Sequence, residues 1–165
     1  MLASPVVLYP DPRLIRPAEA VTDFDADLES DAGRLLAALT SIPALGLAGP
    51  HLGVMRRIVA IDLGAAAGGA RLFINPVVTW ASAETNAFAE GSVSLPGVQE
   101  TLARPSRVRV AWATLSGDPR EDEFEGFMAA CLQHEIDQCD GVFWLDRLSR
   151  LKRERALARF RKLRR

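Results

Sequence analysis

One short stretch of the sequence, QHEIDQ at residues 133–138, contains residue types that can carry out hydrolysis. When two histidines stand four residues apart on a helix, both imidazoles lie on one face and can bind a metal ion. The glutamate between them can then act as a base toward a metal-bound water. Here His134 and Glu135 are present, but Gln138 occupies the position of the second histidine. Alone, the stretch is weak evidence, because a single histidine on an apolar face is more often a hydrogen-bonded core residue.

The surrounding sequence predicts that this stretch lies on a helix from about residue 123 to residue 139. Asp140 and Gly141 follow, and glycine is common just beyond the C-terminus of a helix. Four residues fall on one stripe of this helix: Phe127, Cys131, His134 and Gln138. Because the stripe contains a phenylalanine, we expect it to face the interior of the protein.

The rest of the chain predicts one helix before several strands and one helix after them. Leucines at near-helical spacing predict a helix at residues 25–41, and a last helix runs from about residue 146 to the end. Strands are expected at residues 56–63, 71–78 and 106–115. This order favours the α+β class with an antiparallel sheet, and the length suits a single domain, residues 1–165.

Composition places the chain among ordinary globular proteins, with 48% hydrophobic and 25% charged residues. The first residues lack a basic start followed by an apolar run, so we expect no signal peptide. The uncharged stretch at residues 35–55 contains prolines and glycines, so we expect no membrane insertion.

Cys131 and Cys139 are separated by about 12 Å of helical rise and cannot pair with each other. We therefore expect two reduced thiols, as is typical of a cytoplasmic protein.

The net charge of −1 is unevenly distributed. Residues 147–165 contain ten lysines and arginines and one acid, so this segment carries +9 and the remainder carries −10. A basic tail on an acidic body favours a polyanionic partner such as RNA. The alternative is a solvated helix face whose long basic side chains cover the body of the protein. We expect neither DNA nor a membrane as a partner.

Two further stretches strengthen the evidence from the QHEIDQ motif: ALGLAGPHLGV at residues 44–54 and AEGSVSLPG at residues 89–97. In this order and spacing, the three stretches resemble the peptide deformylase family, whose signatures are G-x-G-φ-A-A-x-Q, E-G-C-L-S and Q-H-E-x-D-H. The likeness extends over nearly the whole chain. It implies small antiparallel sheets around the motif helix, plus a C-terminal helix. It also implies removal of the formyl group from the N-formylmethionine of nascent chains.

The resemblance further implies a metal site, but this chain departs from the family at two of three ligands. In the family, one cysteine and two histidines bind a divalent metal; here Ser92, His134 and Gln138 stand at those positions. A serine hydroxyl keeps its proton at pH 7, and an amide oxygen is only weakly basic. We therefore predict that deformylation is weak or lost and expect no cofactor. An active form would use one divalent metal: iron, zinc or nickel.

Other site residues also follow from the resemblance. Glu135 corresponds to the catalytic glutamate, and His51 stands where the family has a glutamine that helps to hold the reacting oxygen. The backbone amide of Val93 corresponds to a donor toward the oxyanion. The peptide groove would be lined by seven residues: Gly46, Leu47, Ala48, Ser94, Leu95, Pro96 and Gly97. We expect peptide binding to survive, and the basic last helix resembles the part of the family that docks on the ribosome.

Two rearranged active sites remain open. In one, His51 joins His134 and Glu135 as two imidazoles and a carboxylate around a metal, which leaves no evident base. In the other, Ser92 is a nucleophile with His51 or His134 as its base. A third hypothesis is a structural or interaction protein whose former cleft is filled by side chains.

Overall fold

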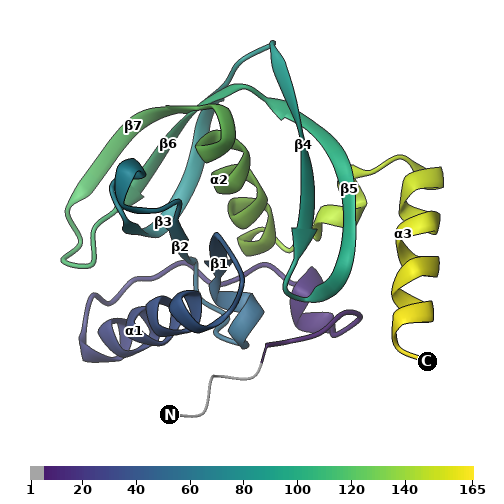
Figure 1. The fold of residues 1–165 in the computed structure, drawn as a ribbon. Coiled ribbons are helices and arrows are strands. Elements are labelled where there is room, and N and C mark those ends of the chain that lie inside the picture. The colour runs from purple at the N-terminus through teal and green to yellow at the C-terminus, as the bar shows by residue number, and fades with distance from the viewer. Residues whose placement is uncertain (1–5) are drawn as a thin grey trace.

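Two antiparallel sheets enclose one central helix in the computed structural model of the chain, which describes residues 6–165. The larger sheet has five strands in the order β1-β2-β3-β6-β7: β1 Gly46–Ala48, β2 Ile58–Asp62, β3 Ala70–Ala81, β6 Arg107–Ala113 and β7 Pro119–Glu125. The smaller sheet is a hairpin of two long strands, β4 Thr85–Ser92 and β5 Leu95–Pro105. The α-helices are α1 Ala26–Ser41, α2 Gly126–Cys139 and α3 Arg150–Leu163. Figure 1 shows α2 between the two sheets, and the predicted α+β class with antiparallel sheets is confirmed.

Helix α1 begins and ends within a residue of the predicted bounds. The Asp25 carboxylate accepts a hydrogen bond from the Leu28 backbone N–H at 3.0 Å and caps the helix. The buried side of the helix carries Leu28, Leu35 and Leu39 into a core that it shares with β1 and β2. The leucine spacing in the sequence therefore identified the face that packs.

The central helix α2 begins later than the sequence predicts. Glu123 and Glu125 lie in β7, where they pair with Arg109 and Arg107 of β6, so the helix begins only at Gly126. Its end is confirmed at Cys139. Gly141 follows with a φ of 77°, and a Cβ atom there would lie 2.8 Å from the backbone nitrogen of Pro17. This position therefore requires glycine for both its backbone angle and its close contact.

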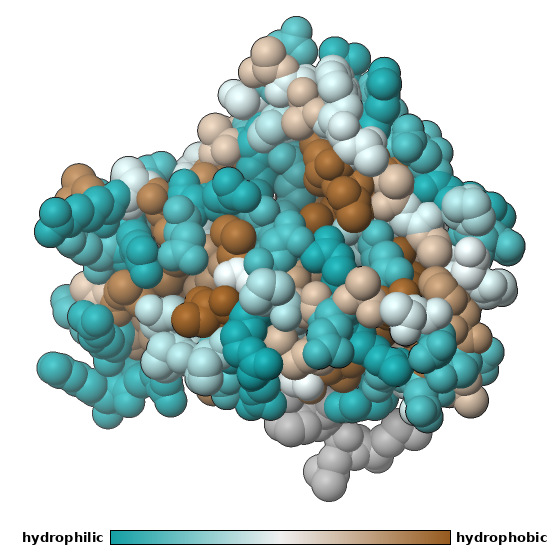
Figure 2. All heavy atoms as spheres, turned by 180° about the vertical axis from the view of Figure 1, so that it is seen from behind, coloured by the Kyte–Doolittle hydropathy of each residue, from teal (hydrophilic) through white to brown (hydrophobic). Residues whose placement is uncertain are grey.

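Helix α3 covers the outer side of β5, and its remaining surface is basic. It begins at Arg150, because residues 144–147 form a separate short 3-10 helix. Ala156 and Phe160 are buried in a core with Leu102 of β5. Figure 2 shows hydrophilic side chains along the edge of the molecule that α3 forms, at the left of that view. Within residues 6–165, no helix combines the length and the apolar character needed to cross a membrane.

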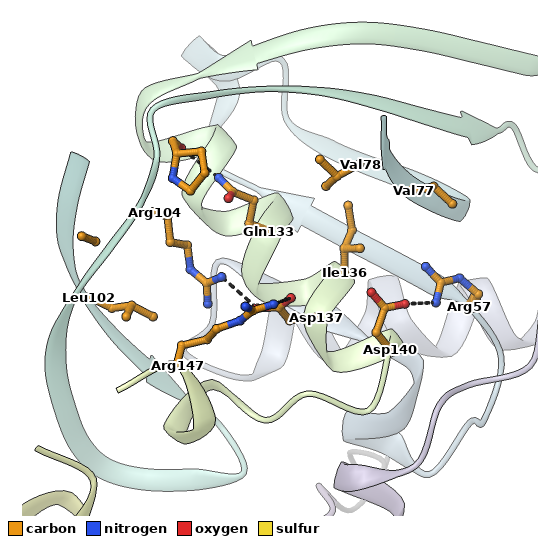
Figure 3. Close-up of a pocket in the computed structure, with 12 residues that line it drawn as sticks. Arg57, Val77, Val78, Leu102, Arg104, Gln133, Ile136, Asp137, Asp140 and Arg147 are labelled. Atoms are coloured by element: carbon orange, nitrogen blue, oxygen red, sulfur yellow. Dashed lines mark hydrogen bonds and ion pairs between the residues drawn. The ribbon is translucent and has the colours of Figure 1, made fainter. Parts of the chain in front are cut away.

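A buried network of ion pairs ties α2 to the β4–β5 hairpin (Figure 3). Arg104 on β5 donates from Nε and Nη2 to the two carboxylate oxygens of Glu90 on β4, at 2.6 and 2.9 Å. Its third nitrogen, Nη1, donates to Oδ2 of Asp137 on α2 at 2.9 Å. Asp137 also accepts two hydrogen bonds from Arg147. Because Arg104, Glu90 and Asp137 are all buried, each charge is tolerated only while its partners are present.

We predict that Arg104→Ala destabilises the fold by about 3–5 kcal/mol, because it leaves two buried carboxylates without their shared cation. Urea unfolding followed by circular dichroism measures the change. The control is Arg109→Ala, which removes an exposed ion pair to Glu123 and should change the free energy of unfolding by less than about 1 kcal/mol. Equal shifts of the two unfolding midpoints would show that the buried network does not hold the hairpin against α2.

Candidate functional site

A cavity of about 810 Å³ opens between the β4–β5 hairpin, the segment before β1 and the first half of α2. Its inner wall contains four of the residues singled out in the sequence: His51, Ser92, His134 and Glu135. The volume lies in the usual range for sites that bind small ligands. The cleft is therefore open and is not filled by side chains, while a structural or interaction role stays a prediction.

His51 is buried and neutral. It lies on a short 3-10 helix after β1, and its Nδ1 accepts a hydrogen bond from the Ala48 backbone N–H at 3.0 Å. The proton of the neutral ring is therefore on Nε2. Burial, with a smaller effect of the neighbouring His134, lowers the pKa of His51 to about 3. The Glu135 carboxylate lies 3.5 Å from Nδ1, but this contact is not an ion pair because the imidazole carries no charge.

His134 is held by a carboxylate that the sequence analysis did not assign. Its Nδ1 lies 2.9 Å from Oε1 of Glu90, the same carboxylate that Arg104 binds. Burial opposes a charge on the ring, but the hydrogen bond to Glu90 and the charge of Glu135 outweigh burial and raise the pKa of His134. Glu90 thereby fixes the orientation of the ring and directs Nε2 away from itself.

Glu135 lies beside both histidines. Its ligand oxygen and one ring nitrogen of each histidine all lie within 4.8 Å of one another. Burial raises the pKa of Glu135 to about 7, although the charges of His134 and Arg104 act in the opposite direction. A Cβ atom at Gly46 would lie 3.0 Å from Oε1 of Glu135, so the glycine leaves room for this carboxylate.

Two buried polar atoms of this cluster have no hydrogen-bond partner among residues 6–165. They are Nε2 of His51 and Oε2 of Glu135. The first is a donor, because the neutral ring carries its proton there, and the second is an acceptor when the carboxyl is ionised. Unpartnered buried polar atoms are rare in folded proteins and call for a ligand or water.

The two substituted ligand positions do not provide metal ligands in this arrangement. The Gln138 side chain is buried, and its amide nitrogen donates to the Leu14 carbonyl at 2.7 Å, so it does not line the cavity. Ser92 lines the cavity, but its hydroxyl accepts a hydrogen bond from the Ser94 backbone N–H at 3.1 Å. The cysteine–histidine–histidine metal of the family therefore does not fit these residues. No hydrogen bond within residues 6–165 joins Ser92 to His51 or His134, as a serine nucleophile would need.

The predicted groove residues divide into two groups. Gly46, Pro96 and Gly97 line the cavity, as does Val93, the predicted oxyanion donor. The other four are fully buried and do not line it: Leu47, Ala48, Ser94 and Leu95. Ala48 still acts on the site through its backbone N–H, which fixes the His51 ring.

The helix stripe that was expected to face the interior is wrong at its first turn. Phe127 is 39% exposed at the cavity wall, where its ring packs edge-on against Phe88 at 5.4 Å between centroids. Cys131 also lines the cavity, but burial raises its pKa to about 12, so it does not supply the missing thiolate. Arg159 of α3 lines the cavity as well. In the sequence it was only one of many basic residues, and its step of four from Arg155 was the one available signal.

Comparisons with known proteins agree with this arrangement. The sequence matches the model of the polypeptide deformylase family over residues 3–154. A peptide deformylase-like protein of Rhizobium meliloti is 46% identical over 165 residues, which cover 100% of this chain and 95% of that protein. One from Bradyrhizobium diazoefficiens is 47% identical over 163 residues, which cover 99% of this chain and 95% of that protein.

A solved structure gives the same result for the fold. The crystal structure of peptide deformylase from Ehrlichia chaffeensis in complex with actinonin matches with a TM-score of 0.91 at 30% identity. The match covers 100% of this chain and 99% of that one. The chain therefore belongs to the peptide deformylase family.

Proposed function

We propose that this protein binds the N-terminal segment of formylated peptides in the cavity, with deformylation that is weak or lost. The observation that carries the proposal is the pair of buried, unpartnered atoms on His51 and Glu135. A formamide group presents one carbonyl acceptor and one N–H donor. The Nε2–H of His51 complements the carbonyl, and the Glu135 carboxylate complements the N–H. The cavity around them is large enough for a short peptide.

The loss of hydrolysis follows from the chemistry of water without a metal. Ordinary water has a pKa of about 15.7, against about 7 when it is bound to a catalytic zinc. Glu135, with a pKa of about 7, would have to remove a proton from ordinary water. A gap of about nine pKa units corresponds to roughly 12 kcal/mol. Glu135 alone therefore cannot produce hydroxide at a useful rate.

A second candidate is a deformylase or related amidohydrolase with a rearranged metal site. His51, His134 and Glu135 lie close enough to hold one divalent metal. One feature weighs against it: Glu135 would become a ligand, which leaves no base. The hydrogen bond from Nδ1 of His134 to Glu90 leaves Nε2 of this ring available to a metal.

We predict that the purified parent carries little metal and has no measurable deformylation of a formyl-Met-Ala-Gln amide peptide. Ser92→Cys with Gln138→His, with or without His51→Gln, should bind about one metal per chain and raise activity by at least about 100-fold. Each single substitution is the control and should gain much less. Elemental analysis and release of formate measure both quantities. Nearly stoichiometric iron, zinc or nickel in the active parent, lost on His51→Ala, would establish the second candidate instead.

Peptide binding provides a separate prediction. In EDTA, the parent should still bind formyl-Met-Ala-Gln amide, and His51→Ala should weaken binding about 10-fold because one buried hydrogen bond is lost. Isothermal titration measures the dissociation constants. Cys131→Ser, which changes another residue of the cavity wall, is the matched control and should have little effect. Binding by the parent that disappears in EDTA would exclude the metal-free mode.

We further propose that the basic surface of α3 docks on ribosomal RNA. Arg161, Lys162 and Arg165 are exposed and have no acidic partner within 4.0 Å among residues 6–165. Deleting the helix would remove the buried Ala156 and Phe160, so charge neutralisation is the cleaner test.

We predict that changing Arg161, Lys162 and Arg165 to glutamine weakens co-sedimentation with ribosomes about 10-fold at low salt, because phosphate contacts are lost. The control variant changes three exposed arginines elsewhere to glutamine: Arg16, Arg34 and Arg120. Equal losses in the two variants would mean that only the total charge matters. No binding by the parent would refute docking.

A further inference from the structure

We propose that Arg159 makes the cavity selective for peptides that carry a carboxylate beyond their first residue, either on an Asp or Glu side chain or at a free C-terminus. This inference rests on the proposed function, because it names the class of peptide that the same cavity prefers. It assigns a peptide-binding role to one residue of the C-terminal helix, apart from the exposed basic residues proposed to contact RNA.

Arg159 reaches the cavity from outside the hairpin. Its Nη1 donates to the Gln99 carbonyl at 3.3 Å, and the side chain is 55% exposed. Its guanidinium therefore makes one long hydrogen bond within the protein, and most of its five N–H donors are free to bind a ligand. Helix α3 is anchored instead by the buried Ala156 and Phe160. Holding the helix in place does not explain the position of Arg159 at the cavity wall.

Arg159 is the only lysine or arginine that lines the cavity in the described part of the chain. The acid nearest to it does not cancel its charge. Glu100 lies between Arg155 and Arg159, with Oε1 at 3.6 and 3.7 Å from the two guanidinium groups. One carboxylate shared by two guanidinium groups leaves one net positive charge. Lys152 of α3 adds another positive charge beside β5, where it donates to the Thr101 carbonyl at 2.8 Å.

The charged groups at the other end of the cavity are bound to one another. Glu90 is bound by Arg104 and by Nδ1 of His134, and Nδ1 of His51 accepts from the Ala48 backbone. Glu135 repels a carboxylate whenever it is ionised. A ligand carboxylate is therefore favoured at Arg159, whose planar guanidinium can bind both of its oxygens.

Isothermal titration with four peptides in EDTA tests the inference. The neutral reference is formyl-Met-Ala-Gln amide. The other three are formyl-Met-Ala-Glu amide, formyl-Met-Ala-Gln with a free carboxylate, and formyl-Met-Ala-Lys amide. We expect at least one acidic peptide to bind about 5–10-fold tighter than the reference, and the lysine peptide to bind more weakly. The stronger of the two acidic peptides identifies the source of the carboxylate.

Variants of Arg159 test whether this residue causes the preference for acidic peptides. In Arg159→Gln, the ratio of acidic to neutral affinity should fall to about one, and Arg159→Lys should keep part of it. Arg150→Gln, on the same helix but away from the cavity, is the control and should keep the full ratio. Thermal unfolding checks that each variant is folded. Equal affinity of the parent for acidic and neutral peptides, or an unchanged ratio in Arg159→Gln, would overturn this inference and leave the proposed function standing. No binding of any peptide would overturn both.

Discussion

The site depends on the hydrogen bonds and ion pair that the Glu90 carboxylate makes. It binds Arg104 through both oxygens and holds Nδ1 of His134 at 2.9 Å. One side chain thus joins the two strands of the hairpin to α2 and orients the His134 ring. Because these groups are buried, their charges must balance, and the carboxylates and guanidinium groups of the network balance one another. These ion pairs and hydrogen bonds join the hairpin to α2 at the cavity wall.

The same balance defines the chemistry that the cavity can support. Burial lowers the pKa of His51 to about 3 and raises the pKa of Glu135 to about 7, whereas the hydrogen bond to Glu90 raises the pKa of His134 against the effect of burial. The part of the cavity beside these three residues therefore suits an uncharged amide, whereas Arg159 places a positive charge elsewhere on the cavity wall. Gln138 takes part in the fold, because its side-chain amide donates to the Leu14 carbonyl of the N-terminal segment.

Local signals in the sequence predicted the local parts of the structure. The acidic residues at the start of α1 and the spacing of its leucines correctly predicted that helix, and Gly141 correctly predicted the end of α2. The start of α2 was wrong because Glu123 extends β7 through pairing with β6, and such pairing leaves no local pattern. The three motifs predicted that His51, His134 and Glu135 lie close together, and the structure confirms this. The hydrogen bond of Gln138 to Leu14 spans 124 residues, and only the folded chain reveals it.

The imidazole nitrogens provide the most direct test of the central claim that hydrogen bonds within the protein, and not a metal, hold His51 and His134. The chain contains two histidines, so a ¹⁵N NMR spectrum of the rings contains the signals of only these two side chains. We expect His51 to be neutral with its proton on Nε2, His134 to carry a proton on Nδ1 toward Glu90, and neither ring to change on addition of one equivalent of zinc at pH 7. A shift of the Nε2 signals of both rings at one equivalent of zinc would contradict the account.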